Sequence, residues 1–335
     1  MDMSRNSVGV LVFVSLVCLT AGCHTSSARD SGAGGTDSPS VVRSLVQVTH
    51  GSDSVGFPHV ATEGDTIACV RLGSKRAEIL TVTVSGPQQT KLISVQGANE
   101  FSPVWHRHAK TGKEMIAFTS DRTPTSTIWE RDPSGVGAQR QIVSDDRSWH
   151  YYEPDVNPVT GKVAFVRSKR RIDQGNPLAT LKYRPDCFIM VCNHDGSDLT
   201  EFVNGVNPRW SPDGKRLAFA RRGLQGNYDI WTIDANGANL TQVTFHPGNE
   251  FEPAWSPDGS RIAYAGEKRA GTMVNLDIWI IRTDGGNPVQ LTTTDTSEGR
   301  PVFARNGDVY FHSFELSGAR KVSVWRVTPN LPPEN

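Results

Sequence analysis

The sequence lacks net charge, long apolar segments and a cysteine framework. Its 335 residues carry 35 Lys and Arg against 35 Asp and Glu, so no overall field attracts nucleic acid, and we predict no nucleic-acid partner. The apolar run at residues 8–19 is too short to cross a bilayer as a stable span. Among the five cysteines, a straight strand would hold Cys187 and Cys192 roughly 16 Å apart, beyond disulfide reach. A transmembrane protein and a disulfide scaffold are therefore both excluded.

The apolar run leads directly into Thr20-Ala21-Gly22-Cys23, which predicts a signal peptide over residues 1–22. Small residues followed by cysteine resemble the bacterial lipoprotein box, although Leu19 stands one place earlier than the leucine of that box. The resemblance implies that Cys23 is lipidated and becomes the mature N-terminus. The alternative is an ordinary secretory signal with an unrelated cysteine.

The residue after the cysteine is His24 rather than Asp, which resembles the sorting pattern of outer-membrane lipoproteins. We therefore expect a bacterial cell-envelope protein that a lipid anchor holds at the outer membrane, facing the periplasm. Residues 23–42 contain the lipidated cysteine and a Gly/Ser-rich stretch that we predict to be a flexible tether. We also predict a disordered tail at residues 331–335.

An internal repeat covers most of the remaining chain. Two copies read Trp-Ser-Pro-Asp-Gly at residues 210–214 and 255–259, and each is followed by Asp-Ile-Trp at 229–231 and 277–279. Successive copies are spaced by 45 to 54 residues, the period of a four-stranded propeller blade. The weaker copies begin at Pro58, Pro103, Pro154 and Pro301. The sequence therefore predicts an all-β fold, a six-bladed β-propeller of four-stranded blades over residues 43–330.

The sixth copy ends without a fourth strand, whereas an extra strand-like segment precedes the first copy. Residues 45–50 (Leu-Val-Gln-Val-Thr-His) resemble the fourth-strand segment 240–245. We therefore predict that the N-terminal strand completes the last blade, with Val46 and Val48 alongside Val324 and Arg326. Such closure removes the open sheet edges that invite aggregation.

These motifs resemble the TolB-type (WD40-like) β-propeller repeat across residues 43–330. The chain departs from TolB itself because only a short tether, rather than an α/β domain, precedes the first strand. No Gly-x-Ser-x-Gly nucleophile elbow follows the blades, which disfavours an appended peptidase. The resemblance implies a fold more strongly than a function, because one fold supports many activities.

The residues immediately before the repeat proline differ from blade to blade, as the residues of a binding ring would. They are Phe57, Ser102, Glu153, Asn207, Glu252 and Arg300. We predict that they line a binding site at the channel mouth together with His59, Trp149 and His150, where Trp149 is the one tryptophan outside the repeat positions. The alternatives are that loop positions vary by drift and that Trp149 covers the gap between two blades.

We expect a non-enzymatic binding or scaffold protein, a monomer without catalytic residues, bound metal or cofactor, whose partner is an envelope protein or peptide. One alternative is a metal-assisted, oligogalacturonate-like polysaccharide lyase or hydrolase that uses histidines near the mouth. These histidines are His50, His59, His150, His246 and His312. The close-spaced pair His106 and His108 falls on the opposite face. A further alternative is a Tol–Pal-like envelope component.

Overall fold

The computed structural model describes residues 40–62, 64–73, 76–84, 90–92, 94, 97–144, 146–171, 186–270, 273–315 and 321–331. The predicted signal peptide, the predicted lipidation site at Cys23 and the tether up to residue 39 lie outside these ranges. Residues 332–335 of the predicted tail lie outside them as well.

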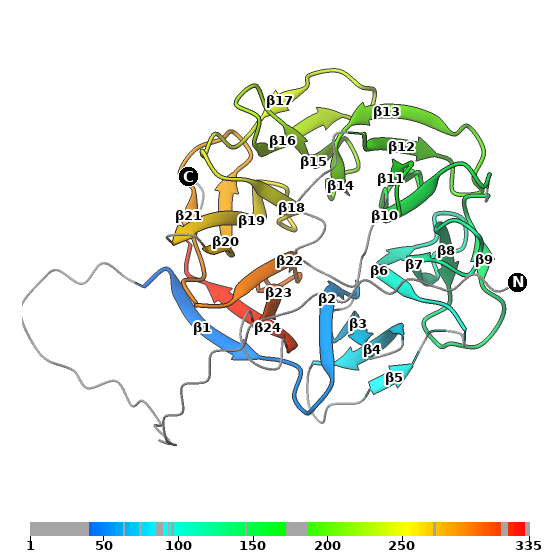
Figure 1. Ribbon diagram of the computed structural model, residues 1–335, viewed down its shortest axis with the longest axis horizontal. Helices are drawn as coiled ribbons and strands as arrows, with labels where there is room; N and C mark the ends of the chain where they lie inside the picture. The colour runs from blue at the N-terminus through cyan, green and yellow to red at the C-terminus, as the bar shows by residue number, and fades with distance from the viewer. Residues whose placement is uncertain are drawn as a thin grey trace, which may run out of the picture. The chain divides into compact units, whose positions relative to one another are not determined.

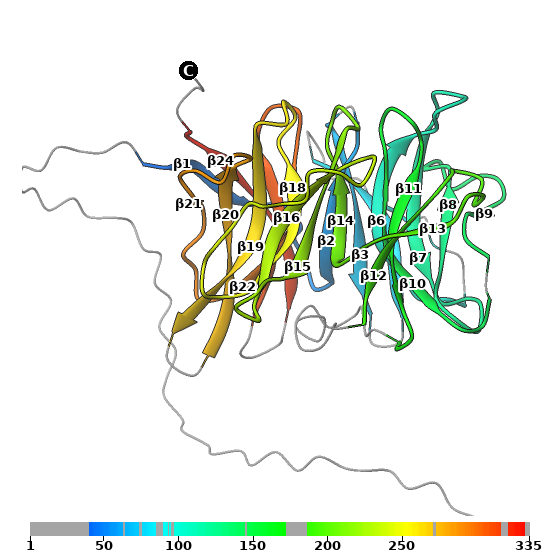
Figure 2. The same cartoon turned by 90° about the horizontal axis from the view of Figure 1, so that it is seen from above.

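The described residues form six antiparallel sheets of four strands each, arranged around a common centre (Figure 1). Figure 2 shows the same sheets from the side. The first strand of each sheet lies nearest the centre, and none of the described residues lies in a helix. The predicted six-bladed β-propeller is therefore confirmed.

Five of the blades are built from four consecutive strands. Blade 1 contains β2 (Ser54–Val60), β3 (Thr66–Leu72), β4 (Ala77–Thr83) and β5 (Thr90–Leu92). Blade 2 contains β6 (Glu100–Arg107), β7 (Glu114–Ser120), β8 (Thr127–Arg131) and β9 (Arg140–Gln141). Blade 3 contains β10 (His150–Val156), β11 (Val163–Ser168), β12 (Phe188–Cys192) and β13 (Thr200–Asn204).

The remaining strands form the second half of the ring. Blade 4 contains β14 (Val206–Trp210), β15 (Arg216–Arg222), β16 (Tyr228–Asp234) and β17 (Thr241–Gln242). Blade 5 contains β18 (Glu250–Trp255), β19 (Arg261–Ala270), β20 (Met273–Arg282) and β21 (Val289–Gln290). Blade 6 contains β22 (Ser297–Phe303), β23 (Val309–Phe314), β24 (Val322–Pro329) and, from the other end of the propeller, β1 (Val42–Gln47).

The pairing of β1 with β24 closes the ring. Val46 lies opposite Arg326 in this antiparallel pair, and the backbone N–H of Val48 donates to the carbonyl of Val324 at 2.7 Å. The hydroxyl of Thr49 accepts a hydrogen bond from the Val324 N–H at 2.9 Å. The predicted closure is confirmed, and it leaves the last blade complete.

The Ser-Pro-Asp-Gly segments form the hairpins between first and second strands, as the turn chemistry predicts. In the hairpin of blade 4, the Ser211 hydroxyl accepts from the Arg216 N–H at 2.9 Å, and the Asp213 carboxylate accepts from the Lys215 N–H at 3.1 Å. Gly214 has a φ of 68°, a conformation that side-chain-bearing residues adopt at a cost. These hairpins and the turns between third and fourth strands lie on one face of the ring, here called the hairpin face.

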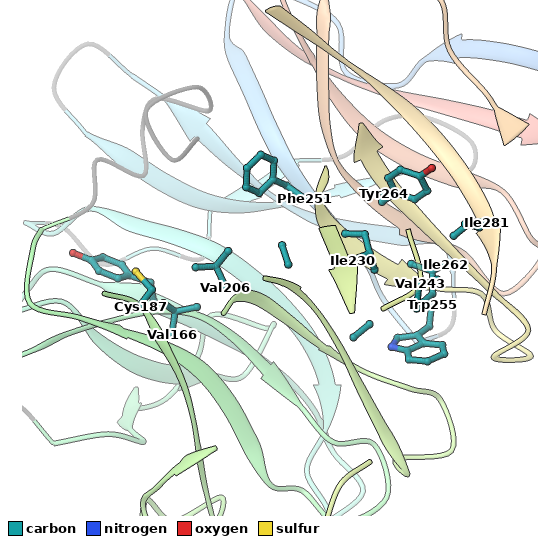
Figure 3. Close-up of a cluster of buried hydrophobic side chains, with 13 residues drawn as sticks. Val166, Cys187, Val206, Ile230, Val243, Phe251, Trp255, Ile262, Tyr264 and Ile281 are labelled. Atoms are coloured by element: carbon teal, nitrogen blue, oxygen red, sulfur yellow. The ribbon is translucent and has the colours of Figure 1, made fainter. Parts of the chain in front are cut away.

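The blades hold together through apolar clusters between neighbouring sheets. Second strands are buried on consecutive residues, as in Leu217, Ala218 and Phe219, because sheets cover both of their faces. Figure 3 shows the cluster that joins blades 3, 4 and 5, which includes Trp255 and Tyr264. Cys69, Cys187 and Cys192 are buried and free. The described residues contain no helix long and apolar enough to cross a membrane.

We expect Thr49→Val to lower the free energy of unfolding by about 1–3 kcal/mol, because the substitution removes the acceptor of a buried backbone N–H. Urea unfolding of the purified protein measures this change. Thr241→Val, at an exposed position of β17, is the control and should change stability by less than about 0.5 kcal/mol. Equal stability of the Thr49 variant and the native protein would show that this bond does not secure the closing strand.

Candidate functional site

All six residues that precede the repeat proline adopt the same left-handed backbone conformation. Their φ angles lie between 51° and 57°, and the strand register shifts at this point in every blade. Each inner strand therefore carries a bulge at the centre of the ring. A positive φ costs a residue with a side chain roughly 1–2 kcal/mol, so six such residues mark a constraint that closure of the ring imposes.

Charged and polar side chains from these bulges meet one another across the ring. The Arg300 Nη2 atom lies 3.2 Å from Glu153 Oε1 in the opposite blade, and its Nε atom lies 3.0 Å from Glu252 Oε1 in the neighbouring blade. Asn207 donates to Glu153 Oε2 from its backbone N–H at 3.1 Å and from its side chain at 2.9 Å. The Arg300 guanidinium also lies over the Phe57 ring, 5.2 Å from its centroid.

The predicted ring of site residues is thus brought together, but its members bond mainly to each other. Glu153 and Arg300 are buried, at 1% and 5% exposure, and so are Phe57, Ser102 and Asn207. The structure places these side chains where they fill the centre of the propeller. Their predicted role in binding a ligand stays a prediction.

A second polar layer follows the repeat proline. His59 Nδ1 accepts from the Trp105 N–H of the next blade at 3.1 Å, and Asp155 Oδ2 accepts from the Trp210 N–H at 2.6 Å. Burial, aided by the positive charge of Arg209, lowers the pKa of His59 to about 3, whereas burial raises the pKa of Asp155 to about 6. His59 is therefore a neutral acceptor that links blades 1 and 2.

His312 is a second neutral histidine at the centre. Its Nδ1 atom accepts from the Phe57 N–H at 3.3 Å, and burial together with the Arg300 charge lowers its pKa to about 3. Of the other histidines predicted near the mouth, His150 accepts from the Ser126 N–H at 3.1 Å, while the side chain of His246 is 56% exposed. The structure does not gather these histidines into one ligand set among the described residues.

Trp149 stands at the junction of blades 2 and 3, beside the apolar cluster between them. The Arg167 guanidinium lies over its ring at 4.3 Å from the centroid, and the Lys169 ammonium lies at 5.1 Å. These cation–π contacts hold the indole. The geometry resembles the inter-blade packing role more than an open stacking platform.

A groove that sequence reasoning missed lies between blades 4 and 5. It has a volume of about 330 Å³ and runs from the β17–β18 loop to the β20–β21 turn. Its walls are mainly apolar and aromatic, formed by Val243, Phe245, Pro247, Tyr264, Trp279 and Ile281. Val243, Tyr264 and Ile281 belong to the cluster shown in Figure 3. We call this feature the blade 4/5 groove.

Phe245 is the exposed aromatic residue of the groove, at 69% exposure. The sequence contains one indication of this groove. Phe245 follows the fourth strand of blade 4, and the equivalent residue after the closing strand is the polar His50. An exposed apolar residue is ordinary by itself, but Phe245 stands beside an apolar groove, and the two together form a surface suited to a contact partner.

Glu250 lies at the floor of the groove and is 1% exposed. Burial, reinforced by the nearby Asp229 carboxylate, raises its pKa to about 8. The Thr244 hydroxyl donates to Glu250 Oε2 and accepts from the Ile230 N–H at 2.8 Å. At neutral pH this carboxyl is protonated, so the groove floor carries no negative charge from Glu250.

Comparisons with known proteins agree with this architecture. Residues 189–329 match the family described as the TolB beta propeller domain. No curated protein matches the chain. A putative TolB from Agrobacterium tumefaciens is similar in structure, with a TM-score of 0.59 and 15% identity, over 85% of this chain and 97% of its own.

Two further solved structures are similar, and both are enzymes by name. An oligogalacturonate lyase from Vibrio parahaemolyticus has a TM-score of 0.55 and 14% identity, over 84% of this chain and 93% of its own. A gluconolactonase from Xanthomonas campestris has a TM-score of 0.58 and 14% identity, over 85% of this chain and 88% of its own. Likeness at this identity shows a TolB-like propeller fold and does not choose between activities.

We expect Arg300→Met to lower the free energy of unfolding by about 3–5 kcal/mol, because it leaves the buried Glu153 carboxylate without its cation. Adding Glu153→Gln should recover part of this loss. Arg305→Met, at an exposed position, is the control and should cost less than about 0.5 kcal/mol. Chemical denaturation measures the stability of all three variants. If Arg300→Met lowered the free energy of unfolding as little as the control does, the result would contradict a stabilising central ion pair.

Because its pKa is raised, Glu250 should make the stability of the protein depend on pH. The folded state holds this proton up to about pH 8, whereas an unfolded glutamate releases it near its ordinary pKa. The contribution of Glu250 to stability is therefore complete at acidic pH and is lost as pH rises toward 8. As the pH rises from 4.5 to 8.5, the free energy of unfolding of Glu250→Gln should increase by about 1–2 kcal/mol relative to that of the native protein. Urea unfolding over this range tests it, and a constant difference between the two proteins would contradict it.

Proposed function

We propose that this chain is a lipid-anchored, non-enzymatic binding module of the bacterial cell envelope, and that its propeller binds a segment of a partner protein in the blade 4/5 groove. The observation that carries the proposal is the groove itself, where Phe245 is 69% exposed beside buried aromatic walls. An extended segment that brings an apolar side chain would cover Phe245 and fill the groove.

The chemistry of the groove suits a peptide more than a charged sugar. Trp279 and Tyr264 provide apolar surface, and Glu250 is neutral at physiological pH, so an apolar side chain meets no buried charge from Glu250. His246 and Glu267 at the edge leave polar groups for the backbone of a bound segment. This division into an apolar centre and a polar rim is typical of protein interfaces.

The lyase alternative draws less support from the described residues. A metal-assisted lyase needs several histidines that are free to coordinate at one place. Here His59 and His312 have pKa values of about 3 and accept backbone hydrogen bonds, which commits them to the contacts between blades. No nucleophile with an adjacent general base is evident at the centre among the described residues.

The envelope location rests on the sequence alone. The apolar run, the box that ends at Cys23 and the polar tether together support export and lipidation. Incorporation of a labelled fatty acid into the native protein and its loss in Cys23→Ala test the anchor. Unlabelled native protein would contradict it and leave a secreted binding module.

A random peptide library displayed on phage tests the groove. We expect the protein to select apolar peptides, and Phe245→Ser to bind them about tenfold more weakly, the effect of losing roughly 1.4 kcal/mol of contact free energy. Val159→Ser is the matched control, because Val159 is 64% exposed in the β10–β11 hairpin on the hairpin face.

Two outcomes would contradict this proposal. One is the absence of any selected peptide, and the other is binding that Phe245→Ser leaves unchanged. Manganese-dependent cleavage of oligogalacturonate would favour the lyase instead. Co-purification with a peptidoglycan-associated lipoprotein would favour a Tol–Pal-like role.

A further inference from the structure

Two histidines and a glutamate converge on the hairpin face, between blades 2 and 3. His106 lies near the end of β6, Glu130 lies on β8, and His194 lies in the turn that follows β12. Glu130 Oε2 is 3.5 Å from His106 Nε2 and 2.9 Å from His194 Nε2. Each of the three residues offers a ligand atom within 4.8 Å of the others.

Among the described residues, the polar atoms that meet here contact one another and have no other hydrogen-bond partner. His106 and Glu130 are buried, at 5% and 2% exposure. Both ring nitrogens of His106, Oε2 of Glu130 and Nε2 of His194 are buried without a hydrogen bond. Two imidazole Nε2 atoms and one carboxylate oxygen converge at one buried place, and this donor set points to a cation that joins them.

We propose that His106, Glu130 and His194 form a binding site for a divalent transition-metal ion of the zinc class. Tetrahedral zinc holds nitrogen and oxygen ligands at about 2.0–2.1 Å, which sets neighbouring ligand atoms roughly 3.3 Å apart. The observed separations of 3.5 and 2.9 Å lie on either side of that value. Two imidazoles with one carboxylate suit zinc or cobalt better than magnesium or calcium.

A second layer of contacts orients the proposed ligands. Arg140 Nε donates to Glu130 Oε1 at 2.6 Å, which leaves Oε2 directed at the histidines. Arg140 Nη2 donates to the His194 carbonyl at 2.9 Å and also approaches His194 Nδ1 at 2.9 Å. A metal on Nε2 requires the proton on Nδ1, so the Nδ1 contact opens on binding while the carbonyl bond remains.

His108 packs beside the cluster but is not one of the three residues whose ligand atoms lie within 4.8 Å of one another. Its ring packs edge-on against His194, with centroids 4.5 Å apart. Its Nδ1 atom accepts from the N–H groups of Lys110 and Thr111, each at 3.3 Å. The side chain of His194 is 16% exposed, so an ion has a route to the site from solvent.

The other blades show that the propeller does not require these residues. At the junction of blades 4 and 5, the same three repeat positions hold Ser211, Thr232 and Thr283. The Ser211 hydroxyl caps its hairpin through Arg216, a role that His106 does not reproduce in blade 2. Two imidazoles and a carboxylate therefore replace three hydroxyls at one junction, which packing alone does not explain.

The test uses purified protein stripped of metal with a chelator and then titrated with Zn²⁺ or Co²⁺. We expect one equivalent of Zn²⁺ to bind with a Kd in the micromolar range or tighter and to raise the Tm. Co²⁺ should give the visible absorption bands of a four- or five-coordinate site with nitrogen ligands. Mg²⁺ should compete with neither ion.

Two variants and a control complete the experiment. Glu130→Gln and His194→Asn should each weaken Zn²⁺ binding at least about 100-fold while the metal-free circular dichroism spectrum stays native. The matched control is His246→Asn, which changes an exposed histidine away from the cluster and should leave the affinity unchanged. Absence of saturable Zn²⁺ binding, binding that survives both ligand variants, or binding lost in His246→Asn would each overturn the proposal.

Discussion

Closure of the ring by β1 and β24 is the constraint on which the rest of the structure depends. Each blade buries its faces only against its two neighbours, so an open ring would expose one sheet face on each of the two blades at the gap. The hydrogen bonds of Val48 and Thr49 with Val324 complete the last blade. Because the closing strand comes from the start of the propeller and its partner from the end, one contact secures both ends.

Closure also brings six inner strands together at one centre, and the six bulges are the consequence. Each bulge bends its strand and turns one side chain toward the others, so that these side chains form a polar network at the centre. Arg300 is the hub of this network, since it reaches Glu153 in the opposite blade and Glu252 in the neighbouring one.

The two proposed binding sites lie at junctions between blades. The blade 4/5 groove combines the exposed Phe245 with the neutral Glu250 beneath it. The cluster of His106, Glu130 and His194 occupies positions that hold three hydroxyl residues between blades 4 and 5. Both sites lie between blades, where two sheets bring together residues distant along the chain.

The sequence determined the fold because its signals are local: a repeat proline and apolar strands recur every 45 to 54 residues, and the extra N-terminal strand matches the missing one. It also identified the six positions that meet at the centre. It did not determine what these residues do. Their burial depends on the closed ring, and Arg300 pairs with Glu153, a residue 147 positions away in the sequence. Likewise the pair of His106 and His108 was visible in sequence, whereas Glu130 and His194 joined it only when blades 2 and 3 packed together.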